Sequence, residues 1–463
     1  MKTSGIFLPI HSLPSKHGTG GFEEAKKFIT FLATARQECW QTGTIHPTNF
    51  EQQFCVTSVF AGNPLYIDFQ QLVQDGLIKQ KDYDNWCSRS HLDWKYSTLR
   101  TSQLVFYAFK TFIRERPTEG YLEFVAKNKY WLDDYCLFNA LKAHFTDASW
   151  DNWQDEDIRK RTPQALAYYT DLLSDEIELY KFEQFLFFSQ WQRLKENLHQ
   201  KRISLFGTLP FYVAYDSADC WANQKLFMLK DDLTPSVLVD TAGQPVAYNW
   251  KNMKQENFSW WQQRLQRANQ LFDAFVVENF SHFHSYPIYG KRGRKSADWS
   301  VVSLFAGQRA KVVAEDFSVD SKLSRLVLKE KTIYTTTAQQ KAFVKGAKRH
   351  QLKNHKEKSV AYLSASNTNS VYDWYSSLSK NTQKEVLQLI NSATGEKLSW
   401  SFIKYLYTTK AEIVMLRMHE LANNLSNSCD SIWQYMAQNK DFSAQNAEKL
   451  KQLCEDAKNE ERV

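Results

Sequence analysis

Eight short apolar runs recur along this 463-residue chain, and most of them are followed by polar or small residues. A short apolar run of this kind is typical of a parallel strand that is buried on both faces. Segments of helical periodicity lie between most of the runs, as in 21–35, where Phe22, Ala25 and Ile29 share one face. Eight strands that alternate with helices predict a (β/α)8 TIM barrel. The runs are 5–10, 39–45, 203–214, 274–280, 312–317, 332–337, 359–363 and 413–418.

The spacing of the runs is uneven, because the second ends at 45 and the third begins only at 203. Three segments between them carry aromatic and aliphatic residues at helical spacing, namely 104–113, 121–145 and 180–199. We therefore predict a helical subdomain over 70–200, inserted between the second and third strands of a single barrel unit that spans 1–463. The residues 430–463 are predicted to form a C-terminal helical surface segment.

The composition limits the classes of partner. Aromatic residues make up 15% of the chain, which suits a large core or a sugar-stacking cleft. The seven cysteines include no C-x-x-C pair, which argues against a zinc site or a disulfide framework. No glycine-rich phosphate loop and no cluster of His or Cys ligands occurs, so we expect no cofactor and no metal. Without a signal peptide or an 18-residue apolar run, a cytoplasmic protein with no membrane contact is expected.

One segment, 329–358, is strongly basic, with nine Lys or Arg residues against two Glu, together with His350 and His355. The first interpretation is a solvated loop and helix face. The alternative is a contact with a polyanion or a protein partner. The segment has no interleaved aromatic residues of the kind that single-stranded nucleic-acid grooves use, so nucleic acid is not expected as a partner.

Two carboxylates follow predicted strands directly. Glu278 comes after the apolar residues 274–277, and Glu315 comes after 312–314. Two acids at strand ends of one parallel barrel would converge on one mouth, and a pair of carboxylates is what glycoside chemistry requires. The alternative is that each acid is a solvated strand end or a salt-bridge partner.

Several long motifs, in order along most of the chain, resemble those of the 4-α-glucanotransferases, the amylomaltase or disproportionating-enzyme family. This resemblance implies a (β/α)8 barrel with inserted helical subdomains. It also implies a retaining reaction that breaks an α-1,4 linkage and moves the glucan to the 4-hydroxyl of another sugar. The motifs are GIFLPIHSLPSKHGTGGF (5–22), SVFAGNPLYID (58–68), WLDDYCLFNALK (131–142), LPFYVAYDSADCWAN (209–223), SWWQQR (259–264) and VAEDF (313–317).

The motifs that carry the family's chemistry are altered. The nucleophilic Asp of R-x-D-H-F-R-G-F falls on Glu278, the Arg of that motif on Val276, and the His on Asn279. The acid/base Glu of the family falls on Glu315 and is intact. The Asp of the family's GDLP motif falls on Thr208.

The third carboxylate, in the family's GTHDN motif, falls on Asn367, and the preceding His falls on Ser366. The late PLQDLL motif falls on 415–420, which read MLRMHE. The resemblance thus assigns the catalytic positions to Glu278, Glu315 and Asn367. Residues expected to contact substrate are Val276, Asn279, His282, Ser366, Asp216 and Trp221.

The substitutions predict a protein that binds or acts on α-glucan with lost or impaired catalysis. A Glu in place of Asp displaces the nucleophile by about 1 Å, which can cost on the order of 100-fold in rate. Removing the third carboxylate costs about 3 kcal/mol or more of transition-state stabilisation. One alternative is an active enzyme that uses Glu278 and Glu315, and another is a scaffold that recruits a partner through 329–358. A shifted alignment would instead place the acids at Asp273, Asp316 or Asp373.

Overall fold

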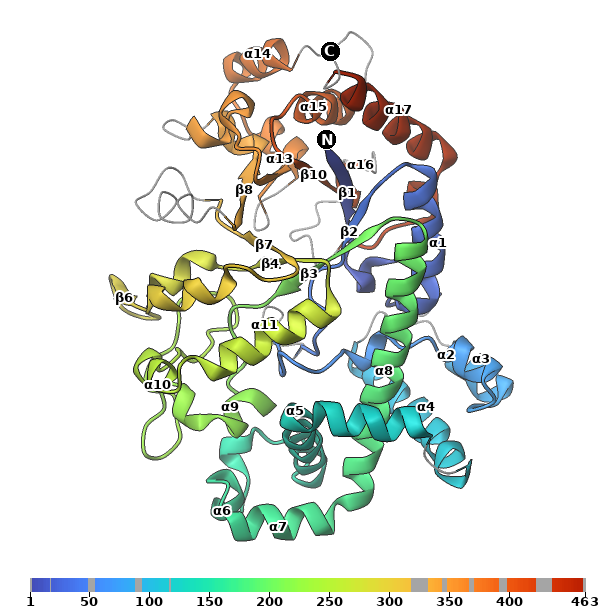
Figure 1. The fold of residues 1–463 in the computed structure, drawn as a ribbon, viewed down its shortest axis with the longest axis vertical. Coiled ribbons are helices and arrows are strands. Elements are labelled where there is room, and N and C mark those ends of the chain that lie inside the picture. Colours follow the sequence, from blue (N-terminus) through green and yellow to red (C-terminus); the bar gives the residue numbers. More distant parts are fainter. Residues whose placement is uncertain are drawn as a thin grey trace.

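A computed structural model describes most of the chain, and eight parallel strands close into a barrel within the described residues (Figure 1). The predicted (β/α)8 barrel is confirmed, and each of the eight predicted runs contains or overlaps one strand. The strands, in their order around the barrel, are β1 (Thr3–Phe7), β10 (Ile413–Arg417), β9 (Ser359–Tyr362), β8 (Tyr334–Ala338), β7 (Lys311–Ala314), β4 (Ala274–Val277), β3 (Ser204–Leu209) and β2 (Cys39–Gln41). The described residues are 2–16, 18–48, 55–87, 94–115, 118–317, 332–343, 348–365, 370–390, 398–421 and 435–460.

The barrel strands are buried on both faces, which explains why their sequences are nearly continuous apolar runs. One set of side chains fills the interior of the barrel, and the alternate set packs against the surrounding helices. The interior cluster contains Phe7, Cys39, Phe206, Ala274, Val276, Val313, Tyr334, Val360, Tyr362, Ile413 and Met415. The interior is therefore a packed core, and a site is possible only at its open end.

The helix α1 (Phe22–Thr34) follows β1 and lies against the outside of the barrel. The main-chain N–H of Gly21 donates to Oε2 of Glu24 at 2.9 Å, and this acid in the first turn stabilises the start of the helix. The buried face contains Ala25, Phe28 and Ile29, which repeat at the spacing that the sequence predicts.

Helices occupy the long stretch between β2 and β3. The predicted helical segments 104–113 and 180–199 fall within two of them, and 121–145 extends one residue past the end of a third. The two longest helices of this stretch, α5 and α8, pack against each other (Figure 1). The division of the chain into a barrel and a separate subdomain over 70–200 stays a prediction. The helices are α2 (Phe69–Gln74), α3 (Gln80–Cys87), α4 (Trp94–Glu115), α5 (Glu119–His144), α6 (Glu156–Arg159), α7 (Pro163–Leu172) and α8 (Ser174–Gln200).

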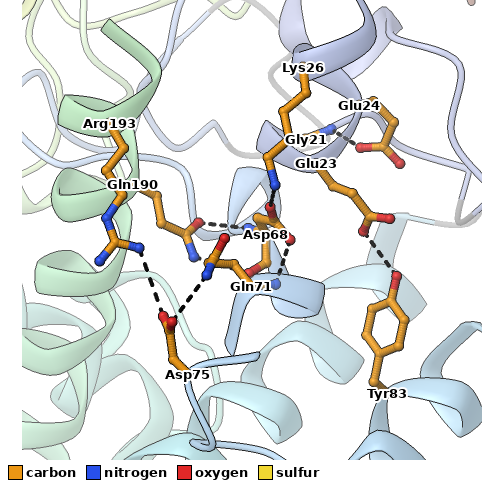
Figure 2. A network of polar contacts seen from close by, with 10 residues as sticks. All are labelled: Gly21, Glu23, Glu24, Lys26, Asp68, Gln71, Asp75, Tyr83, Gln190 and Arg193. Carbon is orange, nitrogen blue, oxygen red and sulfur yellow. Dashed lines mark hydrogen bonds and ion pairs between the residues drawn. The ribbon is translucent and has the colours of Figure 1, made fainter. Parts of the chain in front are cut away.

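A polar network joins α1 to the helices that follow β2 (Figure 2). Nζ of Lys26 lies 2.8 Å from Oδ2 of Asp68, the residue that caps the start of α2. The side-chain amide of Gln190 on α8 accepts from the N–H of Asp68 and donates to its carbonyl oxygen, at 2.7 and 3.0 Å. The hydroxyl of Tyr83 on α3 donates to Glu23 at 2.9 Å. These contacts fix α2, α3 and α8 against a helix of the barrel.

The remaining α-helices follow β3, β9 and β10, and the 3-10 helices lie in the connections between strands or near the C-terminus. Within the described residues, no helix is both long and apolar enough to cross a membrane. The α-helices are α9 (Ala218–Ala222), α10 (Trp250–Gln255), α11 (Ser259–Leu271), α13 (Val371–Ser376), α14 (Lys380–Leu389), α15 (Leu398–Tyr407), α16 (Met418–Leu421) and α17 (Ala444–Glu460). The 3-10 helices are η1 (Ile10–Ser12), η3 (Pro64–Tyr66), η4 (Trp150–Asn152), η5 (Gln224–Leu226), η6 (Phe280–Phe283), η7 (Trp299–Phe305), η8 (Gln339–Phe343), η9 (Lys348–His350), η10 (Leu352–Asn354) and η12 (Asn439–Phe442).

A small antiparallel hairpin, β5 (Ser285–Pro287) with β6 (Arg294–Ser296), stands between β4 and β7 in the chain. The predicted C-terminal segment 430–463 is described only over 435–460, where α17 packs against α1 and α15 and buries Leu450 and Cys454. Its assignment as a surface segment stays a prediction.

Candidate active site

The carboxyl ends of the eight strands surround a small cavity of about 30 Å3. This end of a (β/α)8 barrel is where active sites form, because the loops after the strands converge there. Every barrel strand, or the residue directly after it, contributes to the wall. The lining residues are Phe7, Gln41, Thr208, Val276, Glu278, Glu315, Phe317, Thr336, Tyr362 and Arg417.

The register of two neighbouring strands places Glu278 and Glu315 at the same level. Val277 of β4 pairs with Ala314 of β7, so the acids are the next residues on adjacent parallel strands. The main-chain N–H of Glu315 donates to the carbonyl oxygen of Val277 at 3.0 Å. Both acids line the cavity. The structure therefore brings together the two carboxylates that the sequence places at strand ends.

The electrostatic surroundings of Glu278 favour its protonated form. Burial, and then the negative charge of Glu315, raise the pKa of Glu278 from 4.5 to about 8. Val276, which stands where the resemblance expects an arginine, lies in the cavity wall and is buried. The surroundings of Glu278 therefore disfavour its ionised form.

A buried arginine, Arg417 at the end of β10, also lines the cavity and is only 2% exposed. Its Nη1 donates to Oγ of Ser364 at 3.1 Å and to the carbonyl oxygen of Ala365 at 2.8 Å. Its main-chain N–H donates to Oε2 of Glu420 at 3.1 Å. The attraction of Glu420, Tyr362 and Glu315 partly offsets the burial that lowers the pKa of Arg417. The side chain is thus held in one place by groups from β9, β10 and α16.

Tyr362 and Gln41 close another side of the cavity. The hydroxyl of Tyr362 donates to Oε1 of Gln41 at 2.9 Å, and both side chains are buried. The guanidinium carbon of Arg417 lies 6.0 Å from the centre of the Tyr362 ring, within range of a cation–π attraction. Burial raises the pKa of Tyr362, so its hydroxyl keeps its proton and acts as a donor.

Two further predicted site residues lie just beyond β4 and are absent from the cavity wall. Asn279 has a φ of 46°, a left-handed conformation that Asn tolerates better than most residues, and it begins η6. Nδ1 of His282 lies 3.1 Å from the hydroxyl oxygen of Tyr212. Burial lowers the pKa of His282 to about 4, so its ring is neutral.

Asp216 and Trp221 lie outside the cavity wall and contact other parts of the protein. Asp216 accepts from Nζ of Lys142 at 2.6 Å and from the N–H of Trp150 at 3.2 Å. Trp221 is fully buried, and its Nε1–H donates to the carbonyl oxygen of Ile158 at 3.1 Å. It has no exposed face on which a sugar ring could stack, so its environment is that of a core residue. Ser366 and Asn367 lie outside the described residues.

The three acids of the shifted-alignment alternative are engaged elsewhere and do not line the cavity. Asp316 forms a buried ion pair with Arg349 at 3.5 Å. Asp273 stands before β4, at the opposite end of that strand, and lies 2.8 Å from His199. Asp373 is in the first turn of α13. These positions favour the alignment that places the acids at Glu278 and Glu315.

The sequence interpretation did not assign several wall residues to the site. These are Phe7, Gln41, Phe317, Thr336, Tyr362 and Arg417. Each lies within a predicted strand run, but the run alone does not show which of its residues reach the carboxyl end of the barrel. Among the described residues, no group of three or more His, Cys, Asp or Glu side chains could hold a metal ion.

Comparisons with known proteins match most of the chain. A family model described as 4-alpha-glucanotransferase, glycoside hydrolase 77, matches residues 8–435. The 4-alpha-glucanotransferase of Aquifex aeolicus is 28% identical over 451 residues, which cover 91% of each chain. That of Clostridium butyricum is 27% identical over 483 residues, which cover 96% of this chain and 98% of the relative.

A solved structure with a similar fold is the amylomaltase from Streptococcus agalactiae in complex with acarbose. Its TM-score is 0.91 at 24% sequence identity, over 99% of both chains. This likeness shows that the whole fold is shared. Because the family model spans nearly the full length of the barrel, the chain belongs to the 4-alpha-glucanotransferase family.

Proposed function

We propose that this protein has α-1,4-glucan as its ligand class and that its transferase activity is lost or strongly reduced. Family membership supports the ligand class. The observation that carries the loss of activity is the setting of Glu278 at the nucleophile position, with apolar Val276 and the acid Glu315 beside it in the cavity wall. A retaining mechanism requires an ionised nucleophile beside a protonated acid/base residue. Burial and the negative charge of Glu315 raise the pKa of Glu278, so the setting disfavours the ionised form that a nucleophile needs.

The substituted neighbours of Glu278 support the same proposal. An arginine beside a carboxylate favours the ionised form, whereas Val276 is apolar and offers no charge. Neither burial nor the negative charge of Glu315 favours ionisation of Glu278. Thr208, which also lines the cavity, stands where the family motif has an aspartate. The cavity wall therefore contains the acid/base Glu315, but it lacks the arginine and the aspartate that the family motifs have at the positions of Val276 and Thr208.

The direct test is incubation with maltotriose, followed by a search for glucose and longer maltodextrins. We expect no product above the background set by the matched variant Glu315→Gln, which lacks the acid/base carboxyl. Robust turnover by the wild-type protein, abolished in the variant, would overturn the proposal.

A second candidate function is an active retaining enzyme in which Glu278 is the nucleophile and Glu315 the acid/base. The observation in its favour is that the two carboxyl groups line one cavity. This mechanism needs Glu278 ionised and Glu315 protonated at the same time, so its rate should follow a bell-shaped pH profile. A pH profile of maltotriose turnover therefore distinguishes the two candidates.

The scaffold alternative depends on exposed positive charge in 329–358. Within the described part of this segment, His350 and His355 are buried, and Arg349 forms its ion pair with Asp316. The positive charge that the described part presents to solvent therefore comes from exposed lysines, namely Lys348, Lys353, Lys356 and Lys358. Titration with maltoheptaose separates this alternative from the proposal, because a scaffold that binds no sugar gives no heat at millimolar concentration.

A further inference from the structure

A positively charged side chain lines the cavity at the carboxyl end of the barrel together with the two acids. Arg417 is the last residue of β10 and pairs in register with Phe7, the last residue of β1. Its side chain lines the cavity that Glu278 and Glu315 also line. A charge at this depth is stable only when other groups hold it.

The partners of Arg417 form a closed ring of hydrogen bonds. Its Nη1 donates to Oγ of Ser364 at 3.1 Å, and the Ser364 hydroxyl donates to Oε1 of Glu420 at 2.6 Å. Oε2 of Glu420 then accepts the main-chain N–H of Arg417 at 3.1 Å. The carbonyl oxygen of Ala365 accepts a further bond from Nη1 at 2.8 Å. The guanidinium is therefore fixed, in contrast to an arginine that swings freely in solvent.

The charge of Arg417 opposes the chemistry of the site. The transition state of glycoside cleavage resembles an oxocarbenium ion, so positive charge develops on the sugar between the two carboxyl groups. Arg417 lines the same cavity as the two carboxyl groups, from the strand across the barrel from Glu278, and it attracts Glu315 electrostatically. A guanidinium in this position would repel the developing charge and compete with the sugar for Glu315.

The space around Arg417 also opposes a sugar. The cavity of about 30 Å3 has room for a water molecule or two, whereas small-molecule sites have volumes of roughly 300–1,000 Å3. Tyr362 lies beside the guanidinium and is tied to Gln41 at 2.9 Å. The protein's own side chains therefore fill the place at the end of the barrel where a reacting ring would have to enter.

We propose that Arg417 is a built-in blocking residue, which excludes the reacting glucose ring of an α-1,4-glucan from the space between Glu278 and Glu315. This inference rests on the proposed function and names the group that keeps the ligand from the carboxylates. Within the motif at 415–420, the family pattern PLQDLL has glutamine where this chain has Arg417. The substitution Arg417→Gln therefore removes the charge and installs a shorter residue that the family pattern accepts.

The test measures maltotriose binding by isothermal titration calorimetry. A short sugar is used because a long chain can also bind through contacts far from the cavity. We expect no saturable binding by the wild-type protein at millimolar sugar, and at least tenfold tighter binding by Arg417→Gln. Arg417→Lys keeps the positive charge and should bind no more tightly than the wild type. The matched control is Arg264→Gln, which removes another fully buried arginine outside the cavity wall and should bind as the wild type does.

Three results would overturn the blocking role. They are equal maltotriose binding by the wild type and Arg417→Gln, gain of binding in Arg264→Gln, or gain in Arg417→Lys equal to that in Arg417→Gln. If Arg417→Gln does not fold, Ser364→Ala loosens the guanidinium instead, and the absence of any gain in binding there also counts against the role. Turnover of maltotriose by the wild-type protein is a separate result, since it contradicts the proposed loss of activity.

Discussion

The main-chain N–H of Glu315 donates to the carbonyl oxygen of Val277 at 3.0 Å, so the two candidate carboxylates follow hydrogen-bonded positions on neighbouring strands. This contact sets the level of Glu315 relative to Glu278 through the backbone alone. The backbone that positions the pair is therefore independent of the side chains around it. In the cavity wall, Val276 is an apolar neighbour of Glu278, and Arg417 brings a positive charge from the opposite strand.

The first prediction concerns the pH dependence of stability. In the folded protein the pKa of Glu278 is raised to about 8, above its ordinary value of 4.5. Between these pH values the folded chain keeps a proton that the unfolded chain releases. The contribution of Glu278 to the free energy of unfolding therefore falls as pH rises from about 4.5 to about 8. One pKa unit corresponds to about 1.4 kcal/mol. The difference in free energy of unfolding between Glu278→Gln and the wild type should therefore shift in favour of the variant by about 2 kcal/mol or more from pH 5 to pH 9.

Urea unfolding of both proteins at pH 5 and pH 9 measures this difference. The control is Glu357→Gln, which changes an exposed glutamate. If the free energies of unfolding of the wild type and of Glu278→Gln change in parallel with pH, Glu278 ionises normally in the folded state.

The second prediction concerns recovery of transferase activity. Val276→Arg, Glu278→Asp and Asn367→Asp restore the residues of the family motifs. Because Arg417 still fills the mouth, we expect the triple variant to release little glucose from maltotriose. Adding Arg417→Gln should raise the rate at least tenfold, since it opens space and removes a repelling charge. Equal rates for the triple and quadruple variants would show that Arg417 does not limit the reaction.

The sequence was sufficient to predict the barrel, because the strands are short apolar runs and a buried parallel strand has no alternating pattern. It also predicted that Glu278 and Glu315 converge, since strand ends of one barrel meet at one mouth. The site roles of Ser366 and Asn367 stay predictions, because these residues lie outside the described part of the chain.

Contacts between distant residues could not be predicted in this way. Arg417 is held by Ser364 and Ala365, more than 50 positions earlier in the chain, and only the closed barrel brings β9 beside β10. The burial of His350 and His355 in a basic segment could not be predicted either. Composition gives the number of charged residues but does not show which side chains are buried.

The third prediction concerns Trp221, which the sequence assigned to sugar contact. Its indole packs against Phe138 and Trp153, and the guanidinium carbon of Arg161 lies 4.1 Å from its ring centre. Trp221→Ala should lower the free energy of unfolding by about 3 to 5 kcal/mol, because it leaves a cavity among large side chains. Trp221→Phe should cost less. Urea unfolding measures both, and calorimetry at a temperature where the variants are folded should show unchanged maltoheptaose binding. Weakened binding in a fully folded Trp221→Phe would instead support the sugar contact.

The last prediction concerns Gly207 in β3, which has no room for a side chain. A Cβ atom there would overlap with ring carbons of Phe272, which is itself buried against Trp191. Gly207→Ala should therefore lower the free energy of unfolding by about 1 to 3 kcal/mol through overpacking. The matched control is Gly120→Ala near the start of α5, where no atom lies within 4 Å of the added Cβ. That change should raise stability by up to about 1 kcal/mol, because alanine favours a helix over glycine.

A double-mutant cycle identifies the cause of the Gly207 effect. Phe272→Leu shortens the ring that an alanine at 207 would meet, so the double variant should be less destabilised than the sum of the two single changes. The coupling energy from urea unfolding should be about 0.5 kcal/mol or more. Simple additivity would mean that the alanine acts on the β3 backbone rather than on Phe272.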